Sequence, residues 1–427
     1  MEKFLLPIFM FLLIYAPKIG GAIDSLSLVC AVVFVWSLIR KGINTPNYLI
    51  FPTIKYVFFG IIMLSYSLLL FSVFGLKDTY QILRFGRVII NILGIFGLVR
   101  IYFFYYKENL GQTLLYHLWL CIVCHALIMV LMFLVPAIND FVLTQLVQLD
   151  VNNRSFEDRM EGNRIGGLTG SWDAASGIQS LGVLLIPFIL AYRGGNKTRK
   201  RLIYLTIPLT LWSIFISGVT GLVIILVIGF IFFAFYWQKL RKQVFRFVGV
   251  LFFILLVLNL AFNYTINNHS DMIKETSIGR TLFMITQNDE LSTTASRGST
   301  ATETIDKIGS EMYFLPDDTQ TFFFGKGGSG RVDYTVKADT GPTLNLHNLG
   351  IFFIVSLYLY CFHITIKALK IGRENLYIGM GISAVALTIL IIDFKVAYLL
   401  ARQSLSIMLI AYFSLFWYNN NKSKIQR

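Results

Sequence analysis

Charged residues are scarce in this chain: Asp, Glu, Lys and Arg supply 14% of its 427 residues, while hydrophobic residues supply 56%. An ordinary soluble protein is about a quarter charged, so the composition excludes a typical soluble globular domain. The 38 phenylalanines exceed what a compact core of this size needs, and lipid-facing surface accounts for the excess. We therefore expect an all-α integral membrane protein.

Cysteine is also rare, and the four cysteines (Cys30, Cys121, Cys124 and Cys361) lie within apolar runs, which argues against a disulfide framework. Cys121, Cys124 and His125 match the c-type haem attachment pattern. Their apolar run leaves no room for a haem, so we interpret them as packing residues. The chain lacks zinc-type Cys/His spacing, a Gly-x-Ser-x-Gly elbow and a Walker A loop, and we expect no metal or cofactor.

Long apolar runs dominate what is present. A helix that crosses a bilayer needs about twenty mostly apolar residues, and the runs predict about twelve transmembrane helices in a single polytopic membrane domain over residues 1–427. We interpret the first run as an uncleaved helix, because no convincing signal-peptide cleavage site follows it. The runs lie at about residues 4–17, 23–39, 51–75, 88–106, 113–137, 171–192, 202–217, 219–237, 247–266, 349–368, 377–393 and 396–418.

The net charge of +14 is distributed unevenly between the two predicted sides of the membrane. With a cytoplasmic N-terminus, the cytoplasmic segments hold about 21 Lys and Arg residues and three acids, Glu2, Glu108 and Glu374. The other side holds about 16 basic and 20 acidic residues. The positive-inside rule therefore predicts cytoplasmic N and C termini, and the charge requires no nucleic acid partner.

Two sizeable outer segments follow from this topology, residues 138–170 and residues 267–348, the larger one between the ninth and tenth helices. The first contains Arg164 beside a glycine-rich turn, where a guanidinium and backbone N–H groups can bind a phosphate. An arginine anchored at lipid headgroups remains an equal alternative. The second contains a glycine-rich stretch, residues 324–330, which we interpret as a flexible loop tip.

Further candidate residues lie in the larger segment and in the last helix. Arg280, Arg297 and Arg331 belong to the larger segment, while Asp339 and His347 stand at the mouth of the tenth helix. Arg402 lies inside the apolar part of the last helix, where an ionisable residue suggests a functional site. Arginines, a carboxylate and a histidine beside lipid together indicate a phosphorylated lipid substrate.

From Asp339 to Gly350 the chain resembles the O-antigen polymerase family, since Asp339, Gly341 and Gly350 match its Asp-x-Gly…Gly spacing at a late transmembrane helix. Other short motifs occur in the same order: Arg164-x-x-Gly167, Ser217-Gly218-Val219-Thr220-Gly221, and Arg297 followed by Phe324-Gly325-Lys326-Gly327. The resemblance covers most of the chain and implies a GT-C-like bundle in the bacterial inner membrane, with the 138–170 and 267–348 loops in the periplasm. Pro342 departs from the pattern. His347-Asn348 resembles the related O-antigen ligases, so both activities stay open, with the Asp-x-Gly spacing favouring a polymerase.

The resemblance implies a glycosyltransferase that moves a growing glycan from polyprenyl pyrophosphate onto another lipid-linked repeat unit. Asp339 or His347 would then orient or deprotonate the acceptor hydroxyl. The arginines would bind pyrophosphate or glycan and neutralise the leaving group; the candidates are Arg164, Arg280, Arg297, Arg331 and Arg402. The implied partners are the lipid-linked donor and acceptor, the bilayer and a membrane protein that regulates chain length. A lipid-linked glycan flippase and a membrane scaffold are the alternatives from other classes.

Overall fold

The computed structural model describes residues 2–19, 23–40, 42, 44–147, 165–169, 171–218, 220–241, 312–328, 336 and 340–425. The regular secondary structure among these residues is helical, apart from one short antiparallel pair, β1 (Lys18–Ile19) and β2 (Ile23–Asp24). Six stretches of helix among them are long and apolar enough to cross a membrane. The chain is therefore an all-helical protein of the kind that spans membranes several times.

The helices occupy the apolar runs that the sequence predicts wherever those runs lie within the described residues. In chain order they are α1 (Glu2–Tyr15), α2 (Ser25–Ile39), α3 (Asn47–Phe74), α4 (Tyr80–Tyr106), η1 (Lys107–Asn109), α5 (Leu110–Leu134), α6 (Pro136–Phe141), the π-helix η2 (Val142–Val147), η3 (Gly167–Thr169), α8 (Trp172–Leu184), α9 (Ile186–Arg193), α10 (Lys197–Ser217), the helix Thr220–Arg241, α14 (Thr319–Phe324), α15 (Gly341–Glu374), α16 (Leu376–Lys395) and α17 (Arg402–Ile425). The predicted run at 247–266 lies outside the described residues.

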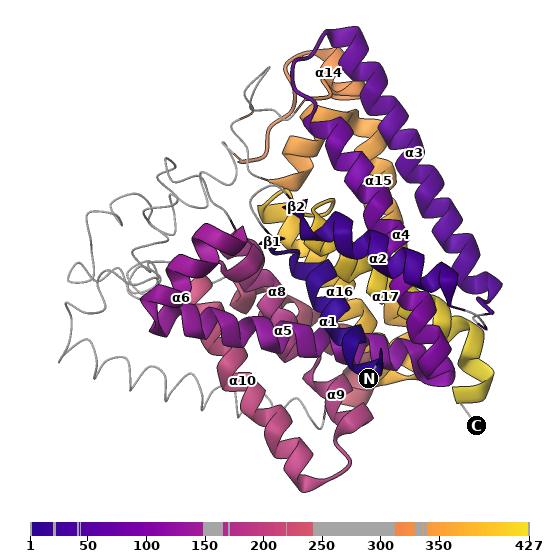
Figure 1. The fold of residues 1–427 in the computed structure, drawn as a ribbon, viewed down its shortest axis with the longest axis vertical. Coiled ribbons are helices and arrows are strands. Elements are labelled where there is room, and N and C mark those ends of the chain that lie inside the picture. The colour runs from indigo at the N-terminus through magenta and orange to yellow at the C-terminus, as the bar shows by residue number, and fades with distance from the viewer. Residues whose placement is uncertain are drawn as a thin grey trace, which may run out of the picture.

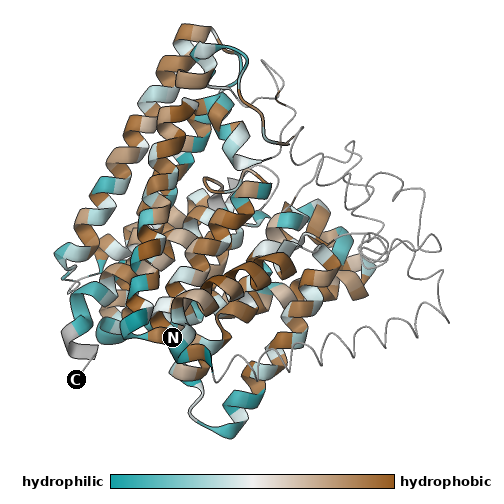
Figure 2. Cartoon of the chain, turned by 180° about the vertical axis from the view of Figure 1, so that it is seen from behind, coloured by the Kyte–Doolittle hydropathy of each residue, from teal (hydrophilic) through white to brown (hydrophobic). Residues whose placement is uncertain are grey.

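Hydrophobic residues occur along most of the helices of the bundle, as the colouring of Figure 2 shows, and many of them are exposed. On α3, Phe51, Phe58 and Leu69 are 60%, 63% and 58% exposed, whereas Met63 on the same helix is buried. A soluble protein rarely exposes so much contiguous apolar surface. Lipid tails are the medium in which such a face is stable, since the helix satisfies its own backbone hydrogen bonds.

Helices distant in sequence pack side by side (Figure 1). α4 packs against α2, α3 and α17, while α15 forms a hairpin with α16, which in turn contacts α8. Asn375 caps α16 at this hairpin by accepting a hydrogen bond from the backbone N–H of Ile378. The C-terminal helices thus contact both the early helices and those in the middle of the chain.

Several segments that the charge distribution predicts to lie on the same side of the membrane meet at one end of the bundle. Arg40 pairs with Glu2 at 2.6 Å, and Lys422 pairs with Glu374 at 2.6 Å. The indole Nε1 of Trp417, in the second half of α17, donates to the backbone carbonyl of Lys107, the residue that follows α4. Both termini of the chain lie toward this end in Figure 1.

α15 contains a sharp break at Gly350, where φ is 78° and ψ is 168°. A short first half, residues 341–349, therefore precedes the long second half, residues 351–374. A Cβ at position 350 would clash with the backbone carbonyl of Phe323, so glycine allows α14 to approach the break closely. The helix begins at Gly341, well before the apolar run that predicts it from residue 349.

The stretch after α14 packs against the first half of α15. The backbone N–H of Lys326 donates to the carbonyl of His347 at 2.8 Å, and that of Gly327 donates to the carbonyl of Asn348 at 2.9 Å. Gly325 and Gly327 are buried. Interpreting residues 324–330 as a flexible loop tip is therefore wrong for residues 325–328, because their glycines serve close backbone packing.

Candidate active site

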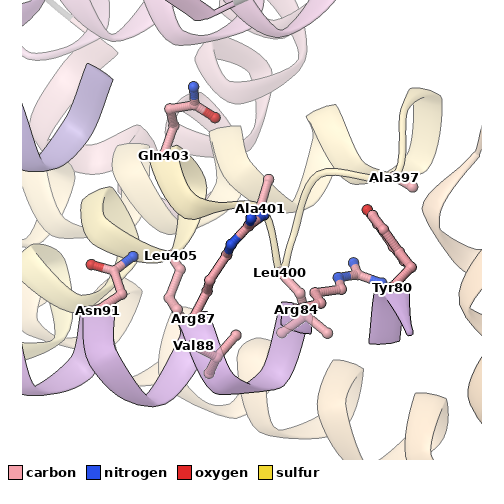
Figure 3. Close-up of a pocket in the computed structure, with 10 residues that line it drawn as sticks. All are labelled: Tyr80, Arg84, Arg87, Val88, Asn91, Ala397, Leu400, Ala401, Gln403 and Leu405. Carbon is pink, nitrogen blue, oxygen red and sulfur yellow. The ribbon is translucent and has the colours of Figure 1, made fainter. Parts of the chain in front are cut away.

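A cavity of about 220 Å³ separates the beginning of α4 from the beginning of α17 (Figure 3). One wall consists of residues on α4: Tyr80, Arg84, Arg87, Val88 and Asn91. The other consists of residues on the α16–α17 connection and the first turn of α17: Ala397, Leu400, Ala401, Gln403 and Leu405. Since α4 and α17 both run from this cavity toward the end that holds the termini, the cavity lies toward the opposite end.

Arg84 and Arg87 bring two guanidinium groups to the same cavity. They are three positions apart on α4, so they share one face of the helix. The sequence pattern predicts neither of them, because the apolar run that predicts this helix begins only at residue 88. The Arg-x-x-Arg spacing directly before an apolar run was the available signal.

Arg84 connects α4 to the first half of α15. It donates hydrogen bonds to Oδ1 of Asn345 at 3.3 Å and to Oε1 of Gln81 at 3.5 Å. Gln81 in turn donates to the backbone carbonyl of Gly328 at 3.1 Å. The side chains of Asn345 and Gln81 are buried, so this network positions the arginine from two directions.

Arg87 has no hydrogen bond or ion pair within the described part of the chain, and it is exposed. The Nδ2 of Asn345 is buried and also has no hydrogen-bond partner among those residues. Guanidinium N–H groups bind the oxygens of phosphate well, since they offer several donors in a fixed plane. The cavity can therefore accept an anionic group between Arg84 and Arg87.

Asp393, near the end of α16, lies beneath the opposite wall and is 0% exposed. Its Oδ1 accepts hydrogen bonds from the backbone N–H groups of Tyr398 at 2.6 Å and Leu399 at 2.5 Å. The hydroxyl of Tyr358 on α15 donates to its Oδ2. The carboxylate thus fixes the α16–α17 connection, which forms part of the cavity wall.

A second polar cluster joins three helices next to this end of α16. Lys395 donates to Oδ1 of Asp173 at 2.7 Å and to the hydroxyl of Thr220 at 2.8 Å. Thr220 also donates to Asp173 at 2.8 Å. The beginning of α8 and the beginning of the helix Thr220–Arg241, whose Thr220 belongs to the Ser217–Gly221 motif, therefore meet at the end of α16.

His347 is the candidate catalytic residue whose side chain the structure describes. Its Nδ1 lies 2.9 Å from the carbonyl of Thr343, and a carbonyl can only accept, so the hydrogen bond assigns the proton to Nδ1. Nε2 of a neutral ring then carries the lone pair and can accept a proton. The ring packs against Phe314 rather than against an arginine among the described residues.

The other predicted site residues lie outside the described part of the chain. These are Asp339, Arg164, Arg280, Arg297 and Arg331. Arg402 is the first residue of α17, and its side chain is likewise outside that part. The structure therefore brings none of these together and tests none of their roles.

The end of the first predicted outer loop is anchored on α5 and α10. The backbone N–H of Ile165, the residue after Arg164, donates to the carbonyl of Ile216 at 2.9 Å. The backbone N–H of Leu168 donates to Nε2 of His125 at 3.0 Å, and Gln179 lies 2.7 Å from Nδ1 of the same ring. Both ring nitrogens of His125 are therefore engaged within the bundle, and Cys121 is buried while Cys124 is exposed.

Comparisons with known proteins add no relative: no family model matches the chain, and no curated protein is significantly similar to it.

Proposed function

We propose that the chain is a polysaccharide polymerase of the O-antigen type, acting at the periplasmic face of the bacterial inner membrane. It transfers a growing glycan from polyprenyl pyrophosphate onto a lipid-linked repeat unit. The observation that supports this most is the cavity that Arg84 and Arg87 share within a bundle of lipid-facing helices. A paired-arginine site in such a bundle suits the pyrophosphate of a membrane lipid.

The proposed topology has about twelve spans, with both termini in the cytoplasm. The end that holds Glu2, Arg40, Lys107 and Lys422 then faces the cytoplasm, in agreement with the positive-inside rule. The arginine cavity consequently opens toward the periplasm. Substrates delivered there are already activated by their pyrophosphate, so no nucleotide sugar is required.

The proposed reaction breaks one bond and forms one bond. The bond between the anomeric carbon of the donor glycan and the pyrophosphate oxygen breaks, and a hydroxyl of the acceptor unit forms the new glycosidic bond. Arg84 and Arg87 stabilise the negative charge that develops on the leaving polyprenyl pyrophosphate. The acceptor hydroxyl loses its proton to a base, for which Nε2 of His347 and the carboxylate of Asp339 are the candidates.

A ligase that transfers the glycan to the lipid A core is the second candidate. The His347-Asn348 pair favours it, because that pair is the feature that resembles O-antigen ligases. The two activities share the donor and the leaving group, so the arginine cavity serves either one. They differ in the acceptor alone.

A gel of surface glycan from a strain that lacks the gene tests the proposal. A polymerase predicts that single repeat units still reach the lipid A core, and that the wild-type gene restores the ladder of long chains. Absence of glycan from the core in any form supports the ligase instead. Accumulation of untranslocated units on the cytoplasmic face contradicts both and indicates a flippase.

A further inference from the structure

Basic residues crowd the turn that joins α9 to α10, between positions 193 and 201, and no acidic residue lies among them. We call this segment the basic turn; its cations are Arg193, Lys197, Arg199, Lys200 and Arg201. Arg193 is half-buried, and the other four are exposed. None of them forms an ion pair within the described part of the chain, whereas Arg40 at the same end of the bundle pairs with Glu2. The basic turn therefore holds charges that no acid of the described residues balances.

The basic turn lies where apolar helices end. The stretch Trp172–Arg193 is long and apolar enough to cross a membrane, so Arg193 terminates an apolar segment. On α10 the exposed apolar residues begin directly after the cations, and Leu202 and Leu205 are 59% and 65% exposed. Figure 2 shows the same change at its lower edge, from a hydrophilic turn to a hydrophobic helix. In a membrane the cations consequently lie at the depth of the lipid headgroups.

The cations at the beginning of α10 are unfavourable for the helix itself. A helix N-terminus carries a partial positive charge, which favours acidic residues, but the first turn of α10 contains none. Its cap is neutral, since Oδ1 of Asn196 accepts from the backbone N–H of Arg199 at 2.8 Å. Lys197 and Arg201 are four positions apart, where like charges on a helix repel each other. A bound anion would lower both electrostatic costs.

Arg193 adds a guanidinium that aromatic rings hold in place. Its Cζ lies over the rings of Tyr116 and Tyr192, 5.0 and 4.7 Å from their centroids. These cation–π contacts fix the side chain without using its N–H donors. Tyrosines are common at the boundary between lipid and water, and a guanidinium at that boundary can bind a phosphate with two parallel hydrogen bonds.

We propose that the basic turn binds the phosphate headgroup of an anionic phospholipid of the surrounding bilayer. The cations neutralise the headgroup, and the acyl chains lie along the exposed apolar residues that begin at Leu202. Clusters of about four to eight Lys and Arg next to a membrane helix are typical of surfaces that bind anionic lipids. The basic turn lies at the opposite end of the bundle from the arginine cavity, so this site does not depend on the proposed function.

The experiment counts lipids on the full-length protein by native mass spectrometry. The protein is kept in a neutral detergent and receives equal amounts of phosphatidylglycerol and phosphatidylcholine with the same acyl chains. We expect the wild type to bind phosphatidylglycerol about tenfold more tightly than phosphatidylcholine. This preference should decline as the ionic strength is raised, because salt screens exposed charges.

The variant Lys197→Gln/Arg201→Gln removes two exposed cations of the basic turn. A cation near an anionic lipid surface contributes about fivefold in affinity, so this variant should bind phosphatidylglycerol about tenfold or more weakly than wild type. Arg40→Gln/Lys422→Gln is the matched control, since it lowers the net charge equally at cations that already pair with acids. The control should stay within about twofold of wild type.

Thermal unfolding without added lipid separates lost binding from lost folding. Lys197→Gln/Arg201→Gln should then be at least as stable as wild type, because it removes like charges from the beginning of α10. Added phosphatidylglycerol should raise the unfolding temperature of the wild type more than that of this variant.

Three results would overturn the inference. One is equal binding of the two lipids by the wild type at low ionic strength. Another is equal weakening of phosphatidylglycerol binding by the basic-turn variant and the control, which would mean that net charge alone attracts the lipid. The third is displacement of phosphatidylglycerol by inorganic phosphate at the same concentration, which would assign the turn to free phosphate.

Discussion

The guanidinium of Arg84 on α4 donates a hydrogen bond to Oδ1 of Asn345 on α15, 3.3 Å away, although the two residues are 261 positions apart in the chain. This contact links the first wall of the cavity to the short half-helix that precedes Gly350. It also places Asn345, which belongs to the predicted outer segment 267–348, next to Arg84, which belongs to the helix after α3. The proposed site is therefore assembled from early and late parts of the sequence.

The two arginines of the cavity should be required for glycan polymerisation. We expect Arg84→Gln and Arg87→Gln each to lower polymer formation by about tenfold or more, because each removes a guanidinium that stabilises the leaving pyrophosphate. Arg100→Gln, near the other end of α4, is the matched control and should leave polymer formation near the wild-type level. Gels of surface glycan measure polymer, and immunoblots of the membrane fraction verify equal amounts of protein. Normal ladders from both cavity variants would contradict the assignment.

His347 should contribute to the chemical step if its Nε2 is the base. Asparagine at this position can keep the hydrogen bond to the carbonyl of Thr343, because its amide nitrogen also donates. It has no group that accepts a proton, so His347→Asn should lower the turnover rate by about a hundredfold. Pyrophosphate binding should stay within about twofold of wild type. A variant that turns over at the wild-type rate would leave Asp339 as the remaining candidate base.

The break in α15 should make Gly350 far less replaceable than an ordinary glycine. Its φ of 78° and ψ of 168° belong to a region that residues with side chains avoid at about 1–3 kcal/mol, and a Cβ there would also clash with the carbonyl of Phe323. Gly75 at the end of α3 has a φ of 59° with no atom near its missing Cβ, so Gly75→Ala adds backbone strain alone. Thermal unfolding in detergent should show the larger loss for Gly350→Ala. Equal losses of stability would mean that the clash with Phe323 of α14 adds nothing to the cost of backbone strain.

Asp318 should make the stability of α14 depend on pH in the acid range. Its carboxylate accepts from the hydroxyl and the backbone N–H of Thr321, each at 2.6 Å, and these hydrogen bonds hold the pKa of that carboxyl below its usual range. A carboxyl group whose pKa is lower in the folded state than in the unfolded state stabilises the protein at pH values above its unfolded-state pKa, near 3.9. This contribution disappears as the pH falls through the folded-state pKa. Asparagine also caps helices but does not titrate.

The stability difference between wild type and Asp318→Asn should therefore shrink as the pH is lowered from about 5 to about 3. Thermal unfolding of both proteins across this range measures the difference. A stability difference that stays constant across this pH range would show that the stabilisation of α14 by its N-terminal cap does not depend on the charge of Asp318.

Much of the helical architecture could be predicted from the sequence, because apolar runs of sufficient length have few alternatives to a membrane helix. The beginnings of α4 and α15 could not be predicted. Arg84 and Arg87 interrupt the apolar pattern, although both belong to α4. Residues 341–349 are polar and short, so only their packing against residues 325–328 and Asp393 explains why they are helical.

The site was harder to predict than the fold for a related reason. Arg84 becomes a candidate only when Asn345 and the α16–α17 connection are placed beside it, and no local pattern predicts that contact. Gly341 and Gly350 were singled out by spacing, and the structure adds physical reasons: one lies against Asp393 and the other against Phe323. Asp339 and the five arginines predicted from the sequence remain predictions.

The most direct test of the central claim uses the purified protein in liposomes, supplied with polyprenyl-pyrophosphate-linked repeat units on the cavity side. A polymerase predicts a ladder of lipid-linked oligomers, with one polyprenyl pyrophosphate released for each bond formed, and loss of the ladder in Arg84→Gln. Units that cross the bilayer without becoming longer, or units that remain unchanged with the wild-type protein, would contradict the account.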